Sequence, residues 1–153
     1  MEPVVGIVMG SNSDRELVAP ALSVLEEFGV PHEVSILSAH RTADKVREYA
    51  LSAEKRGIRV LIAAAGYSAH LPGVLASWSM LPIIGVPLPT SDLKGVDSLL
   101  SIVQMPGGIP VAATGIGRSG AKNAALLAVQ ILGTSDELLR AAYNEYRQKM
   151  ASQ

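Results

Sequence analysis

Short apolar runs alternate with amphipathic stretches along the whole chain. The apolar runs have the length of buried strands and lie at residues 4–9, 32–38, 60–65, 83–86 and 109–113. Helical spacing of apolar positions follows them at 17–28, 42–56, 71–80, 96–103, 120–132 and 135–151. This alternation is typical of parallel sheets covered by helices. It predicts an α/β fold, a three-layer doubly wound parallel sheet of five strands with an extra C-terminal helix.

Two of the predicted helices leave alternatives open. Pro20 falls inside the first, so that either the regular helix starts near Ala19 or the proline kinks it. The last, at 135–151, either packs on its own sheet or contacts a neighbouring subunit. Its predicted apolar face consists of Leu138, Leu139, Ala142, Tyr143 and Tyr146.

Composition limits the possible classes of protein. The 153 residues correspond to one domain, 1–153. The hydrophobic fraction is 48%, the charged fraction 18% and the mean hydropathy +0.30, so we expect some apolar surface to be buried between subunits. A net charge of −1 gives no electrostatic case for nucleic-acid binding.

Several kinds of chemistry are excluded or disfavoured by the residue types present. The chain has no cysteine, which excludes disulfides, a thiol nucleophile and cysteine-ligated zinc. Its three histidines lack metal-ligand spacing, so no metal is expected. The N-terminus lacks the basic region of a signal peptide, and no apolar run reaches about 18 residues. We therefore expect a cytoplasmic protein with no membrane contact.

In doubly wound sheets, ligands bind at the carboxyl ends of the strands. The first such loop, 10–14, combines small residues and hydroxyls that suit an anion with Asp14, which suits sugar hydroxyls better. The alternative is that Ser11, Ser13 or Asp14 only caps the next helix. The second loop groups Ser38, His40 and Arg41, an acid/base beside a cation that could hold a phosphate.

The third loop, 66–73, and two other segments resemble known motifs or are unusual in composition. Residues 66–70 (GYSAH) nearly match a nucleophile elbow, but the final glycine is absent, which argues against a serine hydrolase. Residues 115–120 (GIGRSG) match a dinucleotide fingerprint in the last rather than the first βα unit, so a turn with close helix–sheet contact is favoured. The segment 104–110 is either a turn, a lid or an intersubunit wall.

Taken together, the chain resembles the class I N5-carboxyaminoimidazole ribonucleotide mutases of bacterial de novo purine biosynthesis. The resemblance rests on six collinear motifs: MGSNSD at 9–14, SAHRT at 38–42, AHLPG at 69–73, GVDSL at 95–99, QMPGG at 104–108 and KNAAL at 122–126. It implies a flavodoxin-like fold, a homo-octamer and no metal or organic cofactor. The implied reaction moves a carboxyl group from the exocyclic nitrogen of the nucleotide to ring carbon C4.

The resemblance also implies roles for individual residues. Ser11, Ser38 and Arg41 match phosphate-binding positions, Asp14 matches the ribose position and His40 matches the acid/base. His40 and His70 are the two expected catalytic residues. The carboxyl-transfer region would be lined by Ala39, Gly66, Tyr67, Ser68, His70 and Leu71. His70 favours the mutase over the related carboxylases that use free CO2.

Tyr67 and Ser68 depart from the family, which usually has Gly-Gly-Ala where this chain has Gly66-Tyr67-Ser68. If the position of Tyr67 requires a positive φ, the side chain is strained there. A carboxylase using free CO2 and a non-catalytic nucleotide-binding subunit remain the alternatives.

Overall fold

A parallel sheet with the strand order β2-β1-β3-β4-β5 forms the centre of the computed structural model, which describes residues 2–152. The strands are β1 (Val5–Met9), β2 (His32–Ile36), β3 (Val60–Ala65), β4 (Ile83–Pro87) and β5 (Ala112–Ala113). The predicted five-stranded doubly wound sheet is confirmed. Strand order reverses between β1 and β3, and that position is where such sheets open a crevice for ligands.

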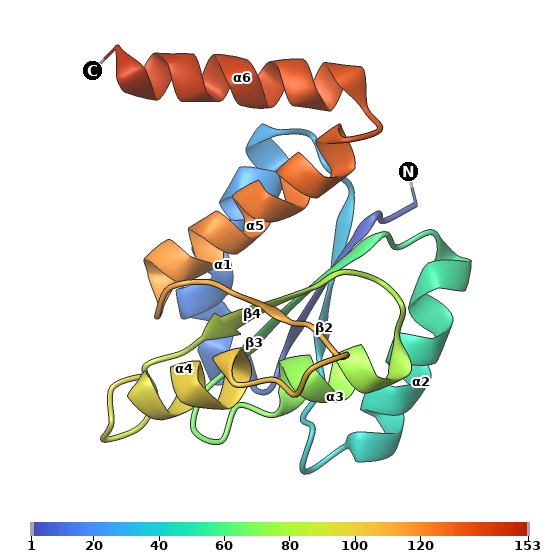
Figure 1. Ribbon diagram of the computed structural model, residues 1–153, viewed down its shortest axis with the longest axis vertical. Helices are drawn as coiled ribbons and strands as arrows, with labels where there is room; N and C mark the ends of the chain where they lie inside the picture. Colours follow the sequence, from blue (N-terminus) through green and yellow to red (C-terminus); the bar gives the residue numbers. More distant parts are fainter. Residues whose placement is uncertain (1, 153) are drawn as a thin grey trace.

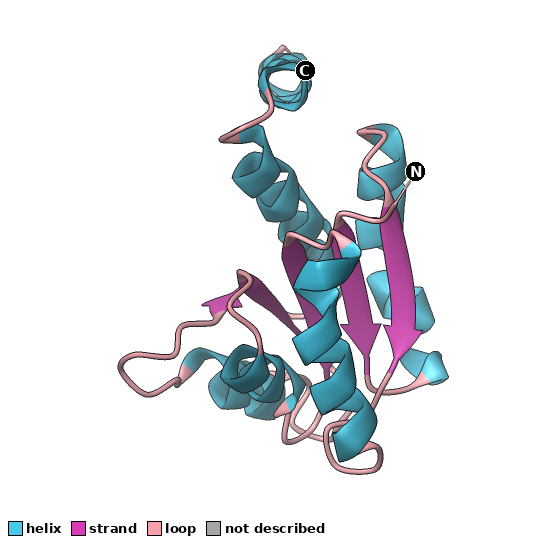
Figure 2. Cartoon of the chain, turned by 90° about the vertical axis from the view of Figure 1, so that its right-hand side faces the viewer, coloured by secondary structure: helices cyan, strands magenta, loops and turns pink. Residues whose placement is uncertain are grey.

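Helices cover both faces of the sheet, as Figures 1 and 2 show. Along β1, Val5, Ile7 and Met9 point into one core cluster, whereas Val8 points into the other. The first cluster is covered by α1 (Arg15–Glu27) and α5 (Arg118–Gly133), and the second by α2 (Ala43–Ala53), α3 (Leu71–Trp78) and α4 (Val96–Val103). Burial of β1, β3 and β4 on both sides explains why their sequences are continuous apolar runs.

Some of the elements are shorter in the structure than the sequence predicts. The strand expected at 109–113 is reduced to Ala112–Ala113, which pair with Ile84 and Gly85. Pro110 lacks an N–H to donate to a neighbouring strand. The strand expected at 32–38 stops at Ile36, and the helix expected at 42–56 ends at Ala53 before a 3-10 turn over Glu54–Arg56.

Pro20 lies inside α1, which begins at Arg15 rather than near Ala19. A proline has no N–H, so the carbonyl of Glu16 loses the donor that a helix would normally supply four residues later. The Arg118 guanidinium, at the first residue of α5, instead donates from Nη1 to the Glu16 oxygen at 2.8 Å. A side chain of α5 thus replaces the missing backbone donor of α1.

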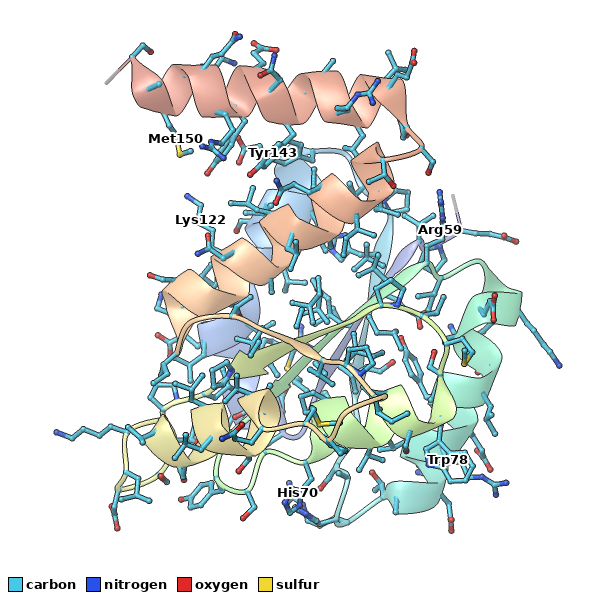
Figure 3. All side chains as sticks on the ribbon, in the orientation of Figure 1. Arg59, His70, Trp78, Lys122, Tyr143 and Met150 are labelled. Carbon is cyan, nitrogen blue, oxygen red and sulfur yellow. The ribbon has the colours of Figure 1, made fainter. Side chains whose placement is uncertain are left out.

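The last helix, α6 (Glu137–Ala151), projects beyond the sheet on the side opposite the carboxyl ends of the strands (Figures 1 and 2). It begins two residues later than expected, because the Asp136 carboxylate caps it by accepting from the Leu139 N–H at 3.0 Å. Tyr143 and Tyr146 pack against Phe28 of the body, and Figure 3 shows Tyr143 on the side of α6 that faces the rest of the chain. Of the predicted apolar face, Leu139, Tyr143 and Tyr146 pack against the core, whereas Leu138 is 85% exposed and Ala142 is exposed as well.

Candidate active site

A pocket of about 620 Å³ opens at the carboxyl ends of the strands. The loops after β1, β2 and β3 form its wall, as the topology predicts. Every residue to which the sequence assigned a catalytic or substrate-binding role lies on this wall: Ser11, Asp14, Ser38, Ala39, His40, Arg41, Gly66, Tyr67, Ser68, His70 and Leu71. Gly10 and Ser13, which also line the pocket, belong to the loop 10–14 selected from the sequence, whereas sequence reasoning did not select the lining residues Ala65 and Thr90. Thr90 comes from the Pro-rich loop after β4, which has no recognisable chemical motif.

The loop after β1 is held by reciprocal contacts between Ser11 and Asp14. The Ser11 N–H donates to Asp14 Oδ2 at 3.2 Å, and the Ser13 N–H donates to Ser11 Oγ at 3.3 Å. Ser11 therefore caps the 3-10 turn Asn12–Asp14 that precedes α1, and because the same residues line the pocket, capping and ligand binding are compatible here. Asp14 is only 7% exposed, and its burial raises the pKa of the carboxyl group, an effect that the Ser11 N–H and the Arg41 charge partly offset.

Arg41 joins the loop after β2 to the loop after β1. Its Nη2 donates to the Gly10 carbonyl at 3.1 Å, and its Nε donates to Ser38 Oγ at 3.4 Å. The Arg41 N–H also donates to Ser38 Oγ, at 3.2 Å, so the hydroxyl oxygen accepts twice. The Ser38 N–H in turn donates to Thr42 Oγ1 at 2.9 Å. This loop presents a guanidinium and a hydroxyl together toward the pocket.

His40 and His70 form a direct contact across the pocket wall. His40 Nε2 lies 2.7 Å from His70 Nδ1, and the two ring centroids are 4.9 Å apart at an interplanar angle of 80°. Figure 3 shows His70 near the lower edge of the molecule. One nitrogen must carry a proton and the other must accept it, because two unprotonated or two protonated nitrogens would repel each other.

The turn after β3 depends on a close backbone approach. A Cβ on Gly66 would overlap the side chain of Thr90, so only glycine allows these two loops to meet. Tyr67 follows with φ = +53°. A tyrosine therefore adopts the left-handed conformation that would suit the glycine usual in the family at this position. The N–H groups of Tyr67 and Ser68 have no acceptor within residues 2–152, and both residues line the pocket.

The other two motifs lie outside the pocket wall. A Cβ on Gly120 would overlap the Gly115 carbonyl, so the 115–120 loop closes on itself, and none of its residues lines the pocket. In the 104–110 loop, Met105 lies beside Gly73 of α3. No residue of this loop lines the pocket of this chain. His70 Nδ1 is paired with His40 rather than with Ser68, which agrees with the argument against a hydrolase.

Comparison with known proteins identifies the family. The sequence profile described as AIR carboxylase matches residues 4–153. The chain belongs to the AIR carboxylase family. Two relatives are named N5-carboxyaminoimidazole ribonucleotide mutase. The protein from Synechocystis is 57% identical to this chain, and the match covers 97% of this chain and 83% of the relative. The protein from Bacillus subtilis is 55% identical, and the match covers 97% of this chain and 91% of the relative.

The flavodoxin-like fold of the AIR carboxylase family is confirmed by a solved structure. Treponema denticola PurE superposes with a TM-score of 0.88 at 31% identity, covering 98% of this chain and 92% of that one. Within residues 2–152 no three His, Asp or Glu side chains group as metal ligands. Over the same range no helix combines the length and apolarity that crossing a bilayer requires.

Proposed function

We propose that this chain is an N5-carboxyaminoimidazole ribonucleotide mutase that gives 4-carboxy-5-aminoimidazole ribonucleotide. The observation that carries the proposal is the His40–His70 contact on the wall of a pocket that also holds Arg41. An acid/base histidine that is oriented by a second histidine, beside an anion-binding group, suits a phosphorylated substrate that must gain and lose one proton. The names of the relatives from Synechocystis and Bacillus subtilis support the same assignment.

The phosphate is assigned to the end of the pocket formed by the first two loops. Arg41 supplies the charge, and the Ser38 hydroxyl, which already accepts two hydrogen bonds from Arg41, has its own proton left to donate. The Ser11 hydroxyl adds a third group on the same wall. Asp14 would repel a phosphate, so its carboxylate is assigned to the ribose hydroxyls as an acceptor.

The acid/base role is assigned to His40. Protonated His40 donates to the carbamate nitrogen as the C–N bond breaks, which releases CO2 and leaves an electron-rich ring. Ring carbon C4 then attacks the CO2 carbon, and neutral His40 removes the C4 proton to restore aromaticity. One proton leaves His40 and one returns, so the cycle closes without an added oxidant, reductant or base.

The His40–His70 contact assigns the two nitrogens of His40 to different tasks. If the Nε2–H of His40 donates to His70 Nδ1, it is retained in both charge states of His40. The proton exchanged with the substrate then belongs to His40 Nδ1. His70, held in the tautomer that carries its proton on Nε2, fixes the orientation of the His40 ring and is a positioning residue.

The carboxyl group is assigned to the turn after β3. The free N–H groups of Tyr67 and Ser68 are suited to bind the carboxylate before and after transfer. Holding CO2 beside C4 makes the second step effectively unimolecular, which can lower its barrier by several kcal/mol. The rest of this wall is formed by Gly66, Ala39 and Leu71, which have no side-chain group that takes up or releases a proton.

We also propose that the protein is cytoplasmic and forms a homo-octamer. Each chain would form one domain, 1–153, of which residues 1 and 153 lie outside the described range. Two observations support assembly. The helix α6 extends beyond the sheet, and it exposes Leu138 and Met150. The same projection supports an intersubunit role for residues 135–151.

The assay for this function follows interconversion of the two synthetic carboxylated nucleotides by absorbance, with and without added bicarbonate. The proposal predicts interconversion that does not depend on bicarbonate. Turnover that requires bicarbonate would instead indicate a carboxylase, and binding without turnover would indicate a nucleotide-binding subunit. Either result would overturn the proposed function.

A further inference from the structure

Tyr67 adopts a backbone conformation that costs stability, and among the described residues its side chain makes no core packing contact or hydrogen bond that would offset this cost. Its φ of +53° lies in the left-handed region, where a side chain other than glycine is strained. The side chain is 63% exposed and belongs to neither core cluster. Within residues 2–152 its ring pairs with no other aromatic ring, and its hydroxyl makes no hydrogen bond to the protein. Strain without compensation in the fold is characteristic of functional positions.

The position of Tyr67 in the pocket indicates what that function is. Among the lining residues it is the only Phe, Tyr or Trp, and the others are small, polar or histidine apart from Leu71. It stands in the turn with Gly66 and Ser68, three residues before His70, so it belongs to the end assigned to the reacting ring. The guanidinium of Arg41, which is assigned to the phosphate, comes from a different loop, the one after β2.

We infer that Tyr67 is a specificity-determining residue whose ring stacks on the heterocycle of the bound nucleotide and shields the carboxyl group from water. This inference rests on the proposed function, which supplies a planar imidazole at this end of the pocket. A tyrosine ring offers a flat apolar face to such a heterocycle and keeps its hydroxyl in water. The Tyr67 ring, which is exposed in this structure, becomes covered when the nucleotide binds.

The strained backbone makes this assignment testable, because two substitutions separate the turn from the ring. Tyr67→Gly removes the ring and tolerates the positive φ, so the free N–H groups of the turn stay in place. Tyr67→Phe keeps the ring and removes only the hydroxyl. Lys94 is a matched control, since it also has φ = +53° but does not line the pocket.

The experiment titrates two probes by calorimetry into the native protein and the variants Tyr67→Gly, Tyr67→Phe and Lys94→Gly. The probes are 4-carboxy-5-aminoimidazole ribonucleotide and ribose 5-phosphate, which lacks the heterocycle. In Tyr67→Gly we expect nucleotide affinity to fall about tenfold and ribose 5-phosphate affinity to change less than about twofold. Tyr67→Phe and Lys94→Gly should keep the native affinity for both probes within about threefold. Relief of strain should raise Tm in both glycine variants.

Three results would overturn the inference. They are an unchanged nucleotide affinity in Tyr67→Gly, an equal loss of affinity for both probes, or a loss in Tyr67→Phe as large as in Tyr67→Gly. Failure of the native protein to bind the nucleotide at all would overturn the proposed function instead. The two failures are therefore distinguishable in one set of titrations.

Discussion

His40 Nε2 and His70 Nδ1 lie 2.7 Å apart, although thirty positions separate the residues in the sequence. His40 belongs to the loop after β2, and His70 directly precedes α3. Because β2 and β3 both flank β1, the parallel sheet brings these two loops to the same edge. The contact requires a proton on one of these two nitrogens and none on the other, and the proposed reaction assigns that proton to His40 Nε2.

His40 and His70 should respond differently to the same substitution. His40→Asn removes the acid/base, so kcat should fall by roughly 10²–10⁴-fold while affinity for the product nucleotide stays within about threefold. His70→Asn removes only the orienting partner, so kcat should fall less and the pH profile of kcat should move. Steady-state kinetics over pH, with calorimetry for binding, measures both. Equal losses of kcat in the two variants, with no change in pH profile for His70→Asn, would contradict the positioning role.

Asp14 should reduce the stability of the folded protein at neutral pH. Its pKa is raised in the folded state, mainly by burial, so the folded protein holds this proton more tightly than the unfolded chain does. The folded state therefore loses stability through Asp14 as pH rises above the ordinary value of 3.8. Asp14→Asn keeps an acceptor for the Ser11 N–H, and we expect it to raise Tm at pH 7 by roughly 1–3 °C.

Two controls accompany the Asp14→Asn measurement. The gain in Tm should vanish below pH 3.8, where the native carboxyl group is itself protonated. Nucleotide affinity at pH 7 should fall, because an amide accepts hydrogen bonds from the ribose hydroxyls less strongly than a carboxylate does. A lower Tm at pH 7 together with native affinity would show that the carboxylate is structural.

Pro20 and Arg118 should be coupled energetically through the Glu16 carbonyl. Arg118→Met removes the guanidinium donor and should destabilise the native protein by about 1 kcal/mol. In a Pro20→Ala background the residue at position 20 supplies its own N–H, so the same change should cost less than half as much. Chemical denaturation of the four proteins of this double-mutant cycle measures the coupling. Additive effects would mean that Arg118 does not substitute for the missing helical donor.

Gly66 should tolerate no side chain, whereas Gly107 should accept one. Gly66→Ala places a Cβ against the side chain of Thr90, so we expect a loss of about 1–3 kcal/mol of stability and weaker nucleotide binding. Gly107 has open space around it and no positive φ, so Gly107→Ala should stay within about 0.5 kcal/mol. Denaturation curves of the two alanine variants would refute the account if they were indistinguishable.

The sequence predicts those parts of this protein that depend on burial and chain order. Continuous apolar runs identify β1, β3 and β4 because both faces of these strands are covered. A parallel sheet then brings the loops containing Asp14, His40 and His70 to one edge, so the pocket could be located before any side chain was placed. The roles of these residues remain predictions.

Features set by particular side-chain contacts could not be predicted in the same way. Thr90 lines the pocket only because Gly66 lets its loop approach, and the contact between His40 and His70 depends on the orientation of both rings. The Arg118 contact that replaces the donor missing at Pro20 joins two helices far apart in the sequence. Periodicity identifies which faces are apolar, but it gives no information about such pairings.

The central claim, that the carboxyl group is transferred within one closed pocket, is tested most directly by isotopic labelling. The substrate would be N5-carboxyaminoimidazole ribonucleotide with ¹³C in its carbamate carboxyl group, converted in the presence of excess unlabelled bicarbonate and quenched early. Mass spectrometry of the 4-carboxy product should show that the label is retained. A product whose C4 carboxyl group carries the isotopic composition of the dissolved bicarbonate would contradict the account.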